Sequence, residues 1–79
     1  MSAPEILVHE LRQPLTAILS NAQAACRMLA AESPDLQEVR EILSDIITCD
    51  KRAAGILGRL EDMLKTTAPK TGFGHRDQA

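Results

Sequence analysis

The sequence predicts an all-α protein, an antiparallel helical hairpin that homodimerises into a four-helix bundle. Its 79 residues allow one domain at most. Phe73 is the single aromatic residue, so a core must be built from Leu, Ile, Val, Met and Ala, which suit helix packing better than sheets. Two long segments carry apolar residues at helical spacing, and a short break around Pro34 separates them.

The first helix is expected over about residues 3–32. Ser2 followed by Glu5 is a capping-box pattern, and Pro4 is tolerated in a first helical turn. Apolar residues then recur at alternating intervals of three and four, which predicts a heptad seam over about three heptads. The seam residues are Val8, Leu11, Leu15, Ile18, Ala22, Ala25 and Leu29.

The second helix is expected over about residues 35–65. Either Ser33 or Asp35 can cap its start, with Pro34 at or near its first position. Its apolar stripe covers about three positions in seven, which is wider than a two-stranded coil needs. The stripe comprises Val39, Ile42, Leu43, Ile46, Cys49, Ala53, Ile56, Leu57, Leu60, Met63 and Leu64.

Together, residues 1–65 form the predicted hairpin domain. A short connection makes the two helices antiparallel neighbours, and one hairpin alone cannot cover the wide second stripe. Two hairpins in a symmetric homodimer would cover it. Residues 66–79, with Pro, Gly and mixed polar residues, are expected to form a linker or disordered tail in which His75 is solvated.

Composition narrows the class of partner. The net charge is −2 with both signs interspersed, so no basic patch predicts nucleic-acid binding. No apolar run is long enough to span a membrane, and no basic segment followed by an apolar run indicates a signal peptide. We therefore expect a cytoplasmic segment without membrane contact. Cys26 and Cys49 are expected to be buried thiols, with a disulfide or a metal pair as the alternatives.

The stretch HELRQPL, residues 9–15, is the unusual part of the first helix. On the predicted seam, His9, Glu10 and Gln13 all face away from the core. Pro14 lacks an N–H and clashes with the carbonyl of Glu10, which costs about 3 kcal/mol and bends a helix. These physical arguments leave two interpretations open, a tolerated kink or a bend that serves function.

Residues 9–25, HELRQPLTAILSNAQAA, resemble the phosphoacceptor motif of sensor histidine kinases. The nearest subfamily has a His-Glu-Leu/Ile-Asn-Gln-Pro-Leu core followed by Ala-Ile and Asn-Ala. The segment DKRAAGILGRLEDML resembles the second helix of the same domains less specifically. The resemblance spans about residues 1–65 and implies a dimerisation and histidine-phosphotransfer (DHp, HisKA-type) hairpin of a two-component signal-transduction system.

The resemblance also implies roles for single residues. His9 is the phosphorylated residue, and Glu10 is the general base of autophosphorylation. Gln13 stands where related kinases use a polar residue to orient the water that dephosphorylates the regulator. Pro14 matches the helix kink of the family, whereas Arg12 replaces the asparagine usual in the nearest subfamily.

The implied chemistry is consistent with these residues. A histidine side chain is mostly neutral at pH 7 and is a nucleophile in that form, while an adjacent carboxylate can accept its ring proton. The implied partners are a second copy, the ATP-binding domain of the same kinase and the receiver domain of a response regulator. ATP and Mg²⁺ would come with the ATP-binding domain, since this chain has no glycine-rich phosphate loop and is expected to bind no cofactor itself. It is therefore expected to be part of a phosphotransferase and inactive alone.

Two other functions stay open at this point. One is an inert dimerisation hairpin in which His9 takes no phosphate. The other is a stand-alone histidine phosphotransfer protein, although such proteins usually have four or more helices in one chain. A metal site at His9 and Glu10 is not expected, because adjacent helical residues diverge by about 100°.

Overall fold

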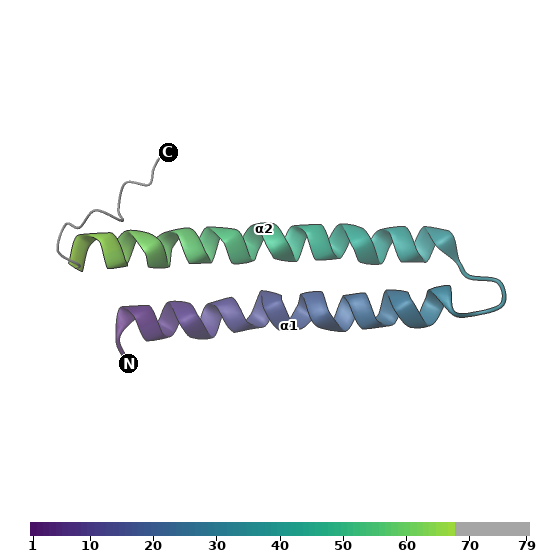
Figure 1. The fold of residues 1–79 in the computed structure, drawn as a ribbon, viewed down its shortest axis with the longest axis horizontal. Helices are drawn as coiled ribbons and strands as arrows, with labels where there is room; N and C mark the ends of the chain where they lie inside the picture. The colour runs from purple at the N-terminus through teal and green to yellow at the C-terminus, as the bar shows by residue number, and fades with distance from the viewer. Residues whose placement is uncertain (68–79) are drawn as a thin grey trace.

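A computed structural model describes residues 1–67 of the chain and contains two helices. Helix α1 runs over Ala3–Leu29 and helix α2 over Leu36–Thr67. They lie side by side and antiparallel, so the predicted all-α hairpin is confirmed (Figure 1). Helix α2 extends to Thr67, slightly beyond the predicted start of the tail. The predictions for Phe73 and His75 fall outside the described residues.

The first turn of α1 is held by the capping box that the sequence predicts. The backbone N–H of Glu5 donates to Ser2 Oγ at 3.3 Å, and the backbone N–H of Ser2 donates to Glu5 Oε1 at 2.8 Å. Two N–H groups that lack helical partners are thereby satisfied. The helix start therefore follows from local chemistry alone.

The connection between the helices runs from Ala30 to Asp35. Helix α1 ends at Leu29 rather than near residue 32, and the Ala30 N–H closes its last turn on the carbonyls of Cys26 and Arg27. Of the two predicted caps for α2, Asp35 is the one used. Its Oδ1 accepts the backbone N–H of Glu38 at 3.1 Å.

The seam between α1 and α2 keeps the predicted residues Leu11, Ile18, Ala22 and Ala25, which are buried or half-buried. It departs from the prediction by one residue at the other positions. Leu7 and Pro14 are buried, whereas the predicted seam residues Val8 and Leu15 are 44% and 51% exposed in the single chain. The reason is that α1 carries two adjacent apolar stripes, and periodicity alone does not say which one faces α2. The buried apolar core comprises Leu7, Pro14, Ala25, Val39, Ala53 and Ile56.

The cysteine prediction is corrected by the structure. Both thiols are free, but Cys26 is exposed and Cys49 is only half-buried. Cys26 lies outside the stripe that α2 covers, one residue after the buried Ala25. Within residues 1–67, no group of three or more His, Cys, Asp or Glu side chains could hold a metal ion. Neither described helix is long and apolar enough to cross a membrane.

Candidate functional site

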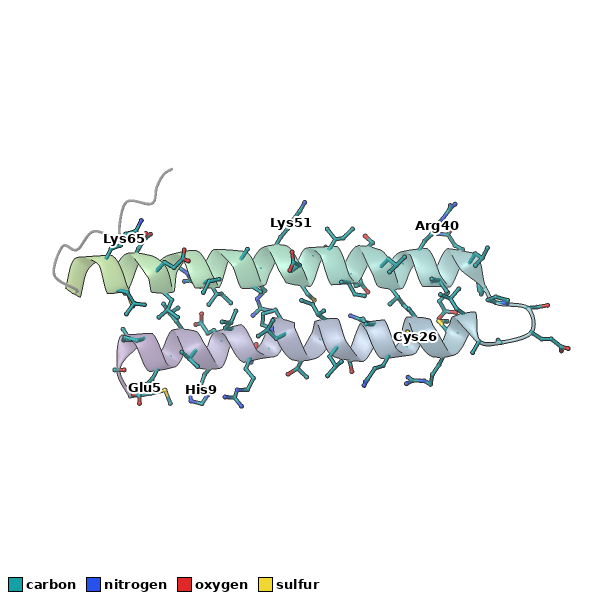
Figure 2. All side chains as sticks on the ribbon, viewed as in Figure 1. Glu5, His9, Cys26, Arg40, Lys51 and Lys65 are labelled. Carbon is teal, nitrogen blue, oxygen red and sulfur yellow. The ribbon has the colours of Figure 1, made fainter. Side chains whose placement is uncertain are left out.

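His9 projects from α1 into solvent. It lies in the second turn of the helix, and Figure 2 shows its ring on the side of α1 that points away from α2. The outward direction predicted for this residue is therefore confirmed. The imidazole is open to partners from outside the hairpin and is carried on a helix that starts at a well-formed cap.

Glu10 points to α2, in contrast to its neighbour. Its Oε1 atom accepts a hydrogen bond from Arg59 Nη2 at 3.2 Å, which is also an ion pair between the two helices. The side chains of Arg59 and Glu10 are 62% and 46% exposed, so the pair lies at the edge of the hairpin and is only partly shielded from water.

Gln13 is held in the same way, one turn further along α1. Its Oε1 atom accepts from Arg52 Nη2 at 3.4 Å. Two arginines of α2 thus hold two polar residues of the HELRQPL stretch. An open groove lined by residues of both helices runs along this edge of the hairpin. Its lining residues are Glu10, Gln13, Arg52, Gly55, Ile56 and Arg59.

These contacts overturn one expectation from the sequence. Glu10 and Gln13 do not both face away from the seam, because the seam runs through Leu7 and Pro14 at this end of α1 and brings them to its flank. Sequence reasoning also missed Arg52 and Arg59. The available signal was their spacing of seven residues, which places both on the same flank of α2.

Pro14 is the most completely buried side chain of the hairpin, with less than 2% of its surface exposed. Helix α1 continues through it from Ala3 to Leu29. Its ring therefore serves as a core residue between the helices, besides leaving the Glu10 carbonyl without its helical N–H partner. This packing role was not anticipated from the sequence.

The flank opposite the arginines is apolar. At about 100° per residue, seven-residue intervals keep side chains nearly aligned. Three exposed apolar residues of α1 and four leucines of α2 follow such intervals on the same side of the hairpin, and Leu19 and Ile47 lie beside them. In α2, Asp50 occupies the one charged position of this series. We name this set the apolar flank: Val8, Leu15, Leu19, Leu29, Leu36, Leu43, Ile47, Leu57 and Leu64.

Comparison with known proteins identifies relatives of this hairpin. The family model described as "His Kinase A (phospho-acceptor) domain" matches residues 5–69. The sensor histidine kinase TmoS of Ectopseudomonas mendocina is 40% identical over 63 residues. That alignment covers 80% of this chain but only 6% of the relative, so the chain corresponds to a small part of a much longer protein. No solved structure matches the chain.

Proposed function

The chain belongs to the family of His Kinase A phospho-acceptor domains, and we propose that it is the dimerisation and phosphoacceptor segment of a sensor histidine kinase, with His9 as the acceptor. The observation that carries the proposal is the direction of His9. It faces solvent on the continuous helix α1, next to a carboxylate residue and shortly before Pro14, within a stretch covered by the family match.

The first reaction is phosphoryl transfer from ATP to His9. One ring nitrogen attacks the γ-phosphorus and forms the P–N bond, while the P–O bond to ADP breaks and ADP leaves with that electron pair. The proton on the other ring nitrogen passes to the carboxylate of Glu10. ATP and Mg²⁺ are supplied by the ATP-binding domain of the parent kinase, and no residue of this hairpin is assigned to hold them.

The second reaction passes the phosphoryl group to a response regulator. An aspartate oxygen of the receiver domain forms a P–O bond as the P–N bond breaks, and the imidazole regains a proton. Because His9 points outward, the ATP-binding domain and the receiver domain can approach the same ring in turn. For dephosphorylation of the regulator, Gln13 is the candidate to orient a water that attacks the phosphorus of the aspartyl phosphate. This step breaks the P–O bond to the aspartate and releases inorganic phosphate. We propose that the segment lies in the cytoplasm.

We further propose that two copies associate through the apolar flank. Nine large apolar side chains remain exposed on that flank in the single chain, and seven-residue spacing in both helices is the pattern of a helical bundle. A second hairpin would cover them and produce the four-helix bundle predicted from the sequence. The groove with Arg52 and Arg59, on the opposite flank, would remain open.

A labelling experiment tests the acceptor. The chain is mixed with radiolabelled Mg-ATP and the separately purified ATP-binding domain of the parent kinase, which is first shown to bind nucleotide. The chain has two histidines, so His9→Gln and His75→Gln form a matched pair. We expect acid-labile, base-stable label on the wild type and on His75→Gln, and none on His9→Gln. Absence of label from the wild type would contradict the proposal and favour an inert dimerisation hairpin.

A further inference from the structure

Resting on the proposed function, we propose that Arg59 is a positioning residue that holds the general base Glu10 against α2 and thereby restrains phosphorylation of His9. Arg52 supports it by holding Gln13. The pair of contacts, Arg59 to Glu10 and Arg52 to Gln13, is called here the arginine latch. Release of the latch makes the base available.

The side chains of His9 and Glu10 point in different directions. His9 and Glu10 are adjacent on α1, so their side chains leave the helix about 100° apart. The His9 ring points away from α2, whereas the Glu10 carboxylate reaches toward α2 and meets Arg59 at 3.2 Å. To accept a proton from the imidazole, this carboxylate must turn toward the outer side of α1. It therefore has to leave the guanidinium.

The latch lies on the N-terminal side of Pro14. Both latched residues of α1, Glu10 and Gln13, precede the proline. The proline has no N–H for the Glu10 carbonyl, so α1 is easiest to bend at this turn. A bend that moves the N-terminal part of α1 away from α2 must break both contacts at once. The latch therefore opposes motion at the weakest point of the helix.

The latch is weak enough to be released. Exposed ion pairs change an equilibrium by about 1.4-fold to 5-fold, and both partners here are substantially exposed. A latch of that size biases the base toward the held position without locking it there. It is also screened by salt, so a change in surroundings or the approach of a charged domain can release it.

The test compares two arginines of the same helix. Arg59→Gln removes the charge from the latch, whereas Arg40→Gln removes a charge from an exposed arginine that points away from α1 in Figure 2. Initial rates of His9 labelling are measured with Mg-ATP and the parent ATP-binding domain. We expect Arg59→Gln to be labelled about 1.4-fold to 5-fold faster than Arg40→Gln at low salt, with the difference shrinking as salt rises. When Glu10→Gln is already present, adding Arg59→Gln should not raise the labelling rate.

A second readout needs no phosphate. Backbone amides in residues 6–13 should exchange with deuterium faster in Arg59→Gln than in Arg40→Gln, by a similar factor. A labelling rate that is unchanged or lower in Arg59→Gln overturns the latch and leaves His9 as the acceptor. Unchanged amide exchange also overturns it. Loss of label from every variant, the wild type included, overturns the proposed function and the latch together.

Discussion

Leu7 and Val8 are neighbours on α1, yet the first is 5% exposed and the second 44% exposed. Leu7 faces α2, while Val8 begins the apolar flank. The same division repeats at Pro14 and Leu15. Within one chain, α2 therefore covers only one of the two apolar stripes of α1. We expect a second copy to pack on the other stripe.

The apolar flank can be tested at Leu15. Leu15→Asp should convert a dimer into a monomer, because pairing of two hairpins would bury an unpaired carboxylate. Helicity should change little, since Leu15 is 51% exposed in the single chain. The control is Thr16→Asp, which adds the same charge at an exposed position outside the flank. Sedimentation measures the oligomeric state of both variants. A dimer of Leu15→Asp would show that two copies associate through a different surface.

Gly55 offers a stability test at the edge of the groove. Apart from the adjoining residues and the local helix backbone, no atom lies within 4 Å of a Cβ placed on Gly55, and the residue is exposed within α2. Gly55→Ala should therefore raise the free energy of unfolding by about 1 kcal/mol through helix propensity. Urea denaturation measures this change. A loss of stability would mean that a second chain or a domain fills the space above Gly55.

The capping contacts of Glu5 should make the stability of the first turn of α1 depend on pH. The Ser2 backbone N–H and then the Ser2 hydroxyl hold the pKa of the Glu5 carboxyl below its ordinary value. A lowered pKa in the folded state means that Glu5 contributes stability above its unfolded pKa, and that this contribution is lost as pH falls through the folded pKa. The first turn of α1 should fray on acidification. Carboxyl carbon NMR should show a lowered midpoint for Glu5 that rises only part of the way in Ser2→Ala, because the backbone N–H remains. A midpoint at the ordinary value would refute the capping contribution.

Pro14→Ala should change the free energy of unfolding through two opposing effects. Pro14→Ala restores an N–H for the Glu10 carbonyl, which relieves about 3 kcal/mol. It also removes about two buried methylenes from a side chain with less than 2% exposure, at about 0.8 kcal/mol each. The net expectation is a gain of about 1 kcal/mol in unfolding free energy. A lower melting temperature by calorimetry would mean that ring packing outweighs the missing hydrogen bond.

Local signals in the sequence were sufficient to predict the architecture. The Ser2 and Glu5 pair marks the start of α1, and the turn chemistry around Pro34 marks the connection. The end of α1 was predicted too late because Ala30 and Ala31 are compatible with a helix, and only the backbone shows the last turn closing at Ala30. Helix propensity does not decide such an end.

The site was predicted in part, for a physical reason. His9 could be placed because it faces away from α2 both on the predicted seam and in the structure. Glu10 lies near the boundary, where an error of one residue in the phase turns a solvent-facing residue into one that contacts α2. The arginines of the latch were not foreseen, since pairing them with α1 requires the register between two helices, which periodicity within one helix does not contain.

The connection at Ala30–Asp35 has a further consequence for how the hairpin forms. Contacts near this turn join residues close in sequence, whereas Gln13 and Arg52 are 39 positions apart, and Glu10 and Arg59 are 49 apart. The entropy of chain closure therefore favours zipping from the turn outward. The segment around His9 would be the last to assemble and the first to open. The end of the hairpin that carries the proposed phosphoacceptor is therefore also the end that opens at the lowest cost in free energy.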